Sequence, residues 1–566
     1  MNKNQEAVGI VTALGMSGEG IVKRENIPVF IPFALPGEEI RYRVVKVKKG
    51  FAFGKLLEVL KPSPDRREPV CPAFGRCGGC QLQHMDYAAQ RSYKRAYVED
   101  CFRKIAFLEI QAEETVARGE PYRYRNKLQL PTGQGGTFGF YAVNSHRVVP
   151  IGDCPIQPAW ARKIISLFSA YCAECGVVAY DEAARTGFLR HIVVREVSGK
   201  MMIAVVGTSE RLPGREKLIG MLNGAFPSVT LYLNVNDRDT NVIFGPRFIL
   251  LSGEPRYRVN VFGIACEFGV ESFLQVNFAI AGALYRDAVL AASPDGDTTV
   301  VDAYSGAGLM TAMLARGAKR AIGIECVREA VECADRVAAL NGLEGRMENI
   351  CAACEDVLPA LVRDLRGRGE KLAVVVDPPR KGCDWAVIEA IARAEPDRVV
   401  YVSCNPATLA RDVGLLTGAL VRTEKGIVRA DCPAMRYEVA FVRPFDMFPQ
   451  TANVETLVVL SHKKPDSHLE VKIDFDNTSL DKTAIVERAE KRKPQEKTTY
   501  KKIQEWIEEN YGFKVHTAYV AEVKRELGLP MYDAPNAVDE LKHPRQHPTE
   551  QMTTAIKAAL KHFEII

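Results

Sequence analysis

The sequence of 566 residues predicts an α/β domain with a buried parallel sheet in residues 261–463. Four apolar, β-branched runs alternate there with helical patterns, at residues 298–302, 321–325, 373–377 and 398–403. Continuous runs of this kind are typical of parallel strands that are covered on both faces. A glycine turn, Gly306-Ala307-Gly308, joins the first run to a helix, as in many nucleotide-binding sheets.

Residues 1–62 are expected to form a small all-β barrel. Short β-branched runs are separated by turn residues such as those at 18–20 and 35–38, and lysines and arginines crowd residues 41–61. A small basic β module is a common RNA-binding design. The alternative is a structural cap with exposed lysines.

Residues 63–260 are predicted to form a mixed α+β domain that carries a cysteine cluster. Within it, residues 121–127 mix aromatic side chains with cations, as base stacking and phosphate contact would require. A strand with a solvated polar face is the alternative for this segment. Residues 464–566 begin as a charged linker to about residue 498 and continue as a small helical extension, for which the sequence suggests no role.

The composition is that of an ordinary globular protein, with 47% hydrophobic and 26% charged residues. No apolar run approaches 18 residues and the polar start lacks a signal peptide, so we expect a cytoplasmic protein without a membrane partner. The 15 cysteines are an odd number and are scattered, which predicts thiols that bind metal or take part in chemistry rather than disulfides. The net charge of +5 alone argues only weakly for a nucleic-acid partner.

The glycine turn and Glu325 together predict a nucleoside-binding site. Glycines let the backbone approach a ligand, and an acid that ends the following strand can hold both ribose hydroxyls. The third glycine of the dinucleotide fingerprint is missing, and S-adenosylmethionine has no pyrophosphate to bind. We therefore favour S-adenosylmethionine over NAD as the cofactor.

The segment Asp-Pro-Pro-Arg at 377–380 closes a strand at the same edge of the sheet. Its two prolines stiffen the loop and keep it from continuing as a helix. Amino-group methyltransferases carry a similar acid-Pro-Pro followed by an aromatic residue. Arg380 stands in that place, which argues against an exocyclic nitrogen as the methyl acceptor.

Cys404, at the end of an apolar strand, is the candidate nucleophile for methylation of a poorly reactive carbon. If a thiolate adds to carbon 6 of uracil, carbon 5 becomes enolate-like and can attack a methyl sulfonium, after which a base must remove the carbon 5 proton. Glu455 is the candidate base, and Glu438, within a strand-like run, is its competitor. The alternative for Cys404 is a buried, inert thiol.

A second group of cysteines has the spacing of a metal site. Cys71, Cys77 and Cys80 follow the pattern Cys-x5-Cys-x2-Cys, and Cys154 lies further along the chain. Four thiolates can hold a [4Fe-4S] cluster or zinc, and spacing alone does not choose between them. The pairs at 172 and 175 and at 351 and 354 are predicted to be structural, because they lie in apolar, helix-like contexts.

Together, these motifs resemble the RNA uracil-5 methyltransferases. The resemblance rests on Ser-Cys-Asn-Pro at 403–406, Asp-Pro-Pro-Arg at 377–380, Asp-Met-Phe-Pro-Gln-Thr at 446–451 and Phe-x-Gln-x-Asn at 273–277, and it covers about residues 7–462. It implies a Rossmann-like class I methyltransferase sheet and an OB-like TRAM barrel that holds RNA. The barrel and the cysteine cluster are most similar to the 23S ribosomal RNA branch of the family.

The resemblance also implies roles for individual residues. Gln275, Tyr304, Glu325 and Asp377 would contact S-adenosylmethionine, Cys404 would be the nucleophile and Glu455 the proton acceptor. Cys71, Cys77, Cys80 and Cys154 would hold a [4Fe-4S] cluster. Two positions depart from the family pattern: Leu309 stands where Asn is frequent, which puts a cofactor contact there in doubt, and Asn453 stands where His is common.

The expected partner is RNA, in particular 23S ribosomal RNA, with no obligate protein partner. The target uridine must lie in a loop or be flipped out, because a stacked base is beyond reach of the thiol. One alternative keeps the chemistry and takes transfer RNA as substrate. Another is a catalytically silent RNA-binding or ribosome-assembly protein.

Overall fold

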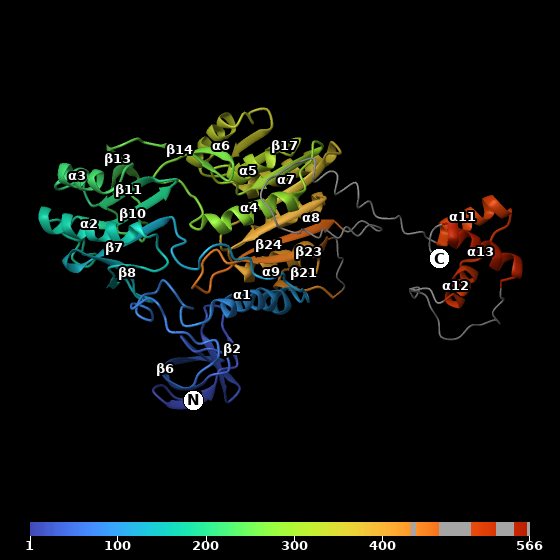
Figure 1. Cartoon of the computed structure of the whole chain (residues 1–566), viewed down its shortest axis with the longest axis horizontal. Coiled ribbons are helices and arrows are strands. Elements are labelled where there is room, and N and C mark those ends of the chain that lie inside the picture. The colour runs from blue at the N-terminus through green and yellow to red at the C-terminus, as the bar shows by residue number, and fades with distance from the viewer. Residues whose placement is uncertain (432–436, 463–499, 528–547, 563–566) are drawn as a thin grey trace. The chain divides into compact units, whose positions relative to one another are not determined.

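A computed structural model describes residues 1–431, 437–462, 500–527 and 548–562 (Figure 1). The chain divides into two compact units, residues 1–466 and 467–566. The whole of the predicted linker at 464–498 lies outside the described residues. Within the described residues, no helix combines the length and the apolar character needed to cross a membrane.

The first unit begins with a curled sheet of short strands. In sheet order these are β1 (Glu6–Ile10), β5 (Glu39–Lys48), β6 (Phe51–Lys61), β4 (Ile27–Ile31), β3 (Gly20–Arg24) and β2 (Ala13–Leu14). Side chains alternate along β5, so that Ile40, Tyr42 and Val44 enter the core while Arg41 and Arg43 face solvent. The alternation explains how a segment this basic still forms a packed β domain.

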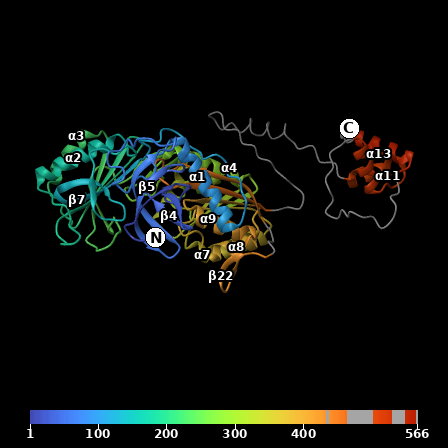
Figure 2. The same ribbon diagram turned by 90° about the horizontal axis from the view of Figure 1, so that it is seen from below.

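A helix, α1 (Tyr87–Cys101), and a short π-helix (Phe102–Ala106) follow the loop that carries the first three cysteines of the cluster. Asp86 caps α1 by accepting a hydrogen bond from the Ala88 backbone N–H. Figure 2 shows α1 beside α9 (Pro406–Thr417) of the α/β domain, and the two helices are in contact. The barrel is thus joined, through the cysteine loop, to a helix that packs on the α/β domain.

A second sheet occupies the middle of the first unit. Its order is β13 (Arg247–Ser252), β12 (Val229–Val235), β11 (Lys200–Gly207), β10 (Leu189–Val197), β7 (Lys127–Gly133), β8 (Thr137–Tyr141) and β9 (Val148–Pro150). One face packs on α2 (Trp160–Cys175) and α3 (Arg215–Ala225) through side chains such as Ile192 and Val194. The opposite face, which carries Val193, shares a core with the α/β domain.

The α/β domain begins with the hairpin of β14 (Tyr257–Val261) and β15 (Ile264–Phe268), followed by helix α4 (Phe278–Ala292). Its main sheet has the order β18 (Met347–Cys351), β17 (Arg320–Glu325), β16 (Thr298–Ala303), β19 (Lys371–Val376), β20 (Arg398–Ser403), β24 (Glu455–His462) and β23 (Tyr437–Phe445). The strands from β18 to β20 are parallel, whereas β24 runs antiparallel to both of its neighbours. The four predicted parallel strands are confirmed, with ends that shift by one or two residues.

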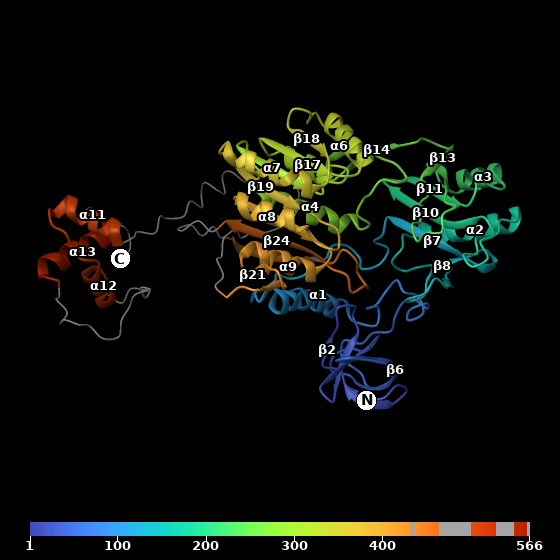
Figure 3. The ribbon, with the colours of Figure 1, turned by 180° about the vertical axis from the view of Figure 1, so that it is seen from behind.

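Two hydrophobic cores cover the faces of this sheet. Helices α4, α5 (Leu309–Ala315) and α6 (Arg328–Leu340) supply one core. Helices α7 (Cys354–Gly367), α8 (Trp385–Ala394) and α9 supply the other, together with α1. Figure 3 shows α7, α8 and α9 in a row on one face. The domain is therefore a three-layer α/β/α structure.

The second unit is helical in its described residues, with α11 (Tyr500–Tyr511), α12 (Thr517–Glu526) and α13 (Glu550–His562). Its core contains Ile503, Ile507, Val523 and Leu560. The Trp506 ring stacks on the His562 ring with centroids 4.9 Å apart. This unit has its own apolar core.

A buried ion pair joins α1 to the segment after β23. The ammonium of Lys94 donates to the Asp446 carboxylate at 2.5 Å and to the Phe448 carbonyl at 3.1 Å, and both charged side chains are fully buried. Burial lowers the pKa of Lys94, and the charge of Asp446 opposes that effect. Removing one partner of such a pair leaves an uncompensated buried charge.

We expect Lys94→Met to destabilise the first unit by about 3–5 kcal/mol, the usual cost of breaking a buried pair from one side. Urea unfolding followed through the fluorescence of Trp385 would measure the loss. The double variant Lys94→Met/Asp446→Asn removes both charges and should recover a large part of it. Equal stability of wild type and Lys94→Met would show that the pair contributes nothing net.

Candidate active site

The sequence-predicted cofactor and catalytic residues follow strands that end at one edge of the main sheet. In the parallel register, Ala303 pairs with Ile324 on one side and with Val376 on the other, and Val376 pairs with Tyr401. The next residues along these strands therefore emerge at the same edge. They are Tyr304, Glu325 and Asp377. On the last of these strands, β20, Cys404 follows at the same edge, three residues after Tyr401.

The turn after β16 has the backbone shape that a close ligand contact requires. Gly306 and Gly308 have positive φ angles of 55° and 77°, and a Cβ on Gly308 would lie 2.6 Å from the Ala334 Cβ. The Gly306 N–H donates to one oxygen of the Glu325 carboxylate at 3.1 Å, and the Val327 N–H donates to the other at 2.8 Å. The turn and the acid that ends β17 are thus fixed to each other.

Two acids, the buried Asp302 and the partly buried Asp377, lie close to this turn. Burial raises the pKa of Asp302 to about 7 and that of Asp377 to about 7, and the charge of Asp377 adds to the effect on Asp302. The Thr311 hydroxyl donates to Asp302 at 2.6 Å and partly offsets its burial. The carboxyl ends of β16 and β19 therefore carry a compact cluster of acids.

Gln275, in the segment before α4, approaches the same cluster of acids through Tyr285. Its side chain hydrogen-bonds the buried Tyr285 hydroxyl, whose pKa is raised by burial and by the neighbouring acids Asp377, Asp302 and Glu455. Its backbone carbonyl accepts a hydrogen bond from the Asn126 amide at 2.8 Å. Four residues predicted to contact the cofactor are thus brought to one place: Gln275, Tyr304, Glu325 and Asp377.

Cys404 and Glu455 lie opposite each other across β20 and β24. Ser403 pairs with Thr456 in antiparallel register, so the next residue on each strand, Cys404 and Glu455, comes directly opposite. Residues opposite in such a pair point to the same face, with Cβ atoms about 4.5–5.5 Å apart. The two groups are close enough for the charge of Glu455 to raise the pKa of the Cys404 thiol.

The local sequence explains the position of the thiol. Pro406 begins α9 at its first turn, and Asn405 caps that helix by accepting from the Ala407 N–H at 3.1 Å. The Ser403 hydroxyl accepts from the Asn405 N–H at 3.1 Å and tightens the turn. Cys404 is held between a strand end and a helix start, where it is only partly buried.

Arg380 balances the charges of this pair, and the sequence analysis did not assign it that role. Burial and the charge of Glu455 raise the pKa of Cys404, whereas a hydrogen bond and the positive charge of Arg380 lower it. Burial and the charge of Asp377 raise the pKa of Glu455 well above its ordinary value, and Arg380 again opposes the shift. A cation next to a thiol favours the thiolate, which is the reactive form.

The backbone of Arg380 is anchored to the helix that follows the thiol. Its carbonyl accepts from the Asn405 side-chain amide at 3.0 Å and from the Thr408 hydroxyl at 3.2 Å. The backbone position of Arg380 is therefore fixed relative to the first turn of α9, which directly follows the thiol. The cation after the two prolines was visible in the sequence, but its direction toward Cys404 was not.

The segment that leads to Glu455 is fixed by α1 and by the cysteine loop. The side chains of Gln90 and Gln450 form a hydrogen bond of 3.0 Å, and the Gln450 carbonyl accepts from the N–H groups of Gln81 and Leu82. Gln450 is buried and has a φ of 70°, which is unusual for a residue with a side chain. These contacts define the path of the chain five residues before the candidate base.

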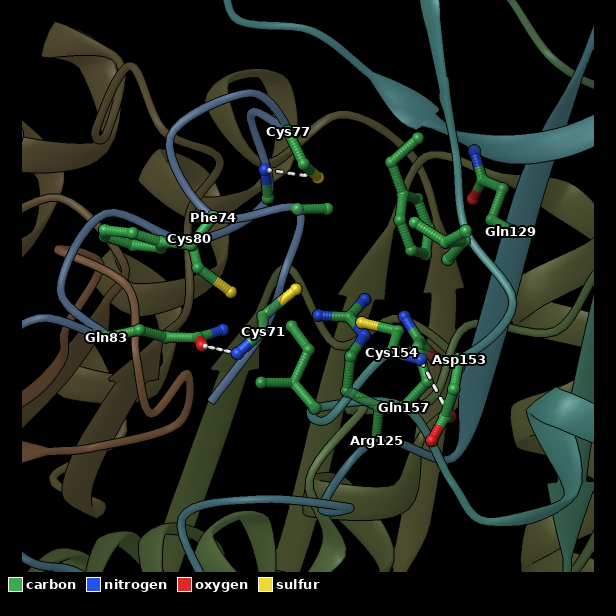
Figure 4. A pocket seen from close by; sticks show the side chains of 15 residues that line it. Cys71, Phe74, Cys77, Cys80, Gln83, Arg125, Gln129, Asp153, Cys154 and Gln157 are labelled. Carbon is green, nitrogen blue, oxygen red and sulfur yellow. Dashed lines mark hydrogen bonds between the residues drawn. The ribbon is translucent and has the colours of Figure 1, made fainter. Parts of the chain in front are cut away.

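The four cysteines of the predicted cluster line one cavity of about 280 Å³ (Figure 4). Burial and the neighbouring thiols raise the pKa of Cys80 to about 12 and that of Cys154 to about 11. Within the described part of the chain, however, no three Cys, His, Asp or Glu side chains are arranged as a metal-binding group. The fold thus brings Cys154 to the other three cysteines, while ligation by them stays a prediction.

The sheet, its glycine turn and the acid that ends the second strand define a class I methyltransferase domain. Two family models agree with this architecture: a TRAM domain at residues 10–57 and a tRNA (uracil-5-)-methyltransferase at residues 254–463. The chain belongs to the RNA uracil-5 methyltransferase family, as its relatives also show.

Among those relatives, a protein of Halalkalibacterium halodurans named as an uncharacterized RNA methyltransferase is 40% identical over 471 residues, which are 82% of this chain and 98% of that protein. A protein of the same description from Clostridium tetani is 37% identical over 82% of this chain and 97% of its own length. The crystal structure of Pyrococcus abyssi tRNA (uracil-54, C5)-methyltransferase with S-adenosyl-L-homocysteine matches with a TM-score of 0.63 and 27% identity. It covers 80% of this chain and 99% of the archaeal one.

Proposed function

We propose that this protein transfers a methyl group from S-adenosylmethionine to carbon 5 of a uridine in 23S ribosomal RNA through a covalent adduct on Cys404. The observation that carries the proposal is the pair of Cys404 and Glu455, opposite each other beside the glycine turn. A nucleophile and a base at one sheet edge are what carbon 5 methylation needs. A silent RNA-binding protein would have no use for this pair.

The residues present fit S-adenosylmethionine. The backbone of Gly306 is open, with no atom within 4 Å of where a Cβ would lie, and the Glu325 carboxylate is held beside it. Glu325 would bind the ribose hydroxyls, and Gln275, Tyr304 and Asp377 would surround the rest of the molecule. When bound, the sulfonium supplies an electrophilic methyl group.

In the proposed mechanism, the Cys404 thiolate forms a bond to carbon 6 of the uracil. Arg380 stabilises the thiolate in a partly buried site. Carbon 5 then takes the methyl group, and Glu455 accepts the proton that carbon 5 loses, so that the carbon–sulfur bond breaks and the thiolate returns. The raised pKa of Glu455 suits an acceptor that must hold this proton until elimination is complete.

RNA binding is supported by cations that lack a counter-ion. Arg125 and Lys127 are partly exposed, and neither forms an ion pair with a described residue, whereas the nearby Arg195 is buried and donates to the Leu274 carbonyl. Burial and the charges of Arg195 and Arg125 lower the pKa of Lys127 to about 8. An RNA phosphate would relieve this repulsion. The TRAM domain adds a second basic surface.

We further propose that Cys71, Cys77, Cys80 and Cys154 hold a [4Fe-4S] cluster. The four thiols line a cavity of about 280 Å³ together with other residues, which gives room for an inorganic core. The similarity of this cysteine pattern to the ribosomal RNA branch favours the cluster over zinc. Of the other two cysteine pairs, Cys172 and Cys354 pack in hydrophobic cores, which supports a structural role, whereas Cys351 is exposed at the end of strand β18 and not in the helix-like context predicted for it.

Protein purified without oxygen should contain about four iron and about four sulfide per chain. Its visible absorption should fall in Cys154→Ser, while Cys351→Ser, an exposed cysteine on the edge strand β18, serves as the control. One zinc per chain without sulfide would refute the cluster. The measurement is independent of methylation activity.

The choice of RNA is tested directly with two substrates. Purified protein is incubated with S-adenosylmethionine and unmodified transcripts of 23S ribosomal RNA or of transfer RNA, and 5-methyluridine is quantified. We expect product in the ribosomal transcript, because the cysteine cluster resembles the ribosomal branch. Product only in transfer RNA would favour the second candidate, which the Pyrococcus abyssi enzyme, named for a tRNA substrate, supports.

A further inference from the structure

The face of the second sheet that carries Val193 also contains a small cavity, which the proposed reaction does not use. The cavity measures about 190 Å³, whereas sites for drug-sized ligands are about 300–1,000 Å³. Its polar and aromatic lining comes from Gln129, Tyr141, His146, Glu182, Arg190 and His191. A space of this size and lining suits a single ring system.

His191 is the residue that points to a ligand. It is only 8% exposed, its Nε2 is 3.3 Å from the Tyr141 hydroxyl, and its Nδ1 is buried without a hydrogen-bond partner. A buried polar atom left without a partner costs about 1–3 kcal/mol, so it is usually satisfied by water or a ligand. The Nδ1 of His191 therefore lacks a hydrogen-bond partner among the described residues, whereas its Nε2 contacts the Tyr141 hydroxyl at the cavity wall.

The charges around the cavity favour a neutral ligand. Burial and the charge of Arg190 lower the pKa of His191 to about 4, so the imidazole is neutral at pH 7 and offers one donor and one acceptor. Arg190 already donates to the carbonyls of Asn236 and Arg238. Glu182, which pairs with His146 at 3.1 Å, would repel a phosphate.

The aromatic rings of the cavity suit a planar ligand. The Tyr141 ring lies 5.4 Å from the His146 ring and 6.5 Å from the His191 ring, measured between centroids. Nucleobases are recognised in this way, by stacking on aromatic side chains and by hydrogen bonds to their edges. The chemistry of the cavity therefore matches a base and not the sugar–phosphate backbone.

The cavity also shares a wall with a larger one that leads toward the catalytic residues. Phe140 and Tyr141 line both cavities, and the larger one measures about 750 Å³. Its other walls are barrel residues 16–19, the cysteine loop at 78–81 and Asn453, which is two residues before Glu455. A strand that runs from the barrel to the catalytic base would pass Tyr141.

We propose that this cavity binds an unpaired nucleobase of the substrate RNA other than the target uridine. The proposal rests on the proposed function, because it takes the larger cavity as the path of the RNA. Seating a second base would fix the register of the strand, so that only one uridine reaches Cys404. The aromatic side chains supply stacking, and the polar groups that line the cavity, among them Tyr141 and His191, bond to the edge of the base.

The test uses a fluorescein-labelled 23S ribosomal RNA fragment that the protein binds, in which each unpaired nucleotide is replaced in turn by an abasic one. Binding of the full-length protein is measured by fluorescence anisotropy. We expect one position besides the target uridine at which the abasic RNA binds about tenfold more weakly to wild type. Tyr141→Ala should bind intact RNA about tenfold more weakly and lose nothing further on that abasic RNA.

His191→Gln is the second variant, because it keeps the Tyr141 ring and changes only the hydrogen-bonding edge. Phe107→Ala, which removes an aromatic side chain that is 48% exposed and lines none of these cavities, is the control. Unchanged melting temperatures and S-adenosyl-L-homocysteine affinity would show that the variants are folded. The proposal would be overturned if both cavity variants bound intact RNA with wild-type affinity. It would also be overturned if each variant lost the same further affinity on every abasic RNA as wild type does.

Because the readout is RNA affinity, the result does not depend on methyl transfer. Absence of 5-methyluridine from every RNA would refute the proposed function and leave the binding measurement interpretable. Conversely, normal methylation with unaltered binding by Tyr141→Ala and His191→Gln would refute the base cavity alone. The two failures are therefore distinguishable.

Discussion

Cys404→Ala is expected to lower the rate of 5-methyluridine formation by about 10⁴-fold or more, the scale of loss when a covalent nucleophile is removed. In the proposed site the methyl donor contacts residues at the ends of β16, β17 and β19 and not the thiol, so affinity for S-adenosyl-L-homocysteine should stay within about twofold of wild type. The result would separate chemistry from cofactor binding.

Single-turnover methylation with tritiated S-adenosylmethionine measures the rate, and calorimetry measures the affinity. Cys175→Ala is the matched control, since this partly buried cysteine ends α2 on the second sheet and lies outside the proposed site. RNA containing 5-fluorouridine should form a denaturation-resistant adduct with wild type and with the control variant. Wild-type turnover by Cys404→Ala would refute the covalent mechanism.

The sequence indicates candidate catalytic side chains, which stay predictions, but it does not indicate how they are arranged. The apolar runs at 298–303 and 398–403 indicate parallel strands, and local order places a residue after each strand at one edge of the sheet. The antiparallel return of β24, however, was not predicted, and that return brings Glu455 opposite Cys404. Strand pairing across fifty residues depends on tertiary packing and not on local pattern.

The contacts that fix the site are more distant still. Gln90 and Gln450 are 360 residues apart in sequence, and Lys94 and Asp446 are 352 apart. A buried lysine on a helix gives no sign in the sequence of which acid will neutralise it. Similarly, β18 was missed because it is a partly exposed edge strand with little apolar character. The weak signals belong to elements whose neighbours, and not their own residues, decide their structure.

Glu455→Gln is expected to lower turnover by about 10²–10⁴-fold, the usual contribution of a general base. The amide preserves the size of the side chain but cannot accept the carbon 5 proton. Adduct formation and methyl transfer precede this step, so the variant should accumulate methylated RNA bound to Cys404. Denaturing gel electrophoresis with labelled RNA would show the adduct.

Glu438→Gln is the matched control, because this acid lies on the neighbouring strand β23 and was the competing base. It should turn over normally without an adduct. If instead Glu438→Gln accumulates the adduct and Glu455→Gln does not, the roles of the two acids are reversed. Normal turnover by both variants would place the base elsewhere.

The pH dependence follows from the sign of the pKa shifts at this pair. Glu455 must be ionised to accept the proton and Cys404 must be ionised to attack, so turnover rises as pH increases through each pKa. Burial raises the pKa of both groups, which moves the rise to higher pH than for an ordinary glutamate near 4.3. Glu455→Gln should lose the part of this rise that belongs to the carboxylate and keep the part that belongs to the thiol. A pH profile of single-turnover rates would separate them, and an unchanged profile in Glu455→Gln would show that this carboxylate does not carry the proton.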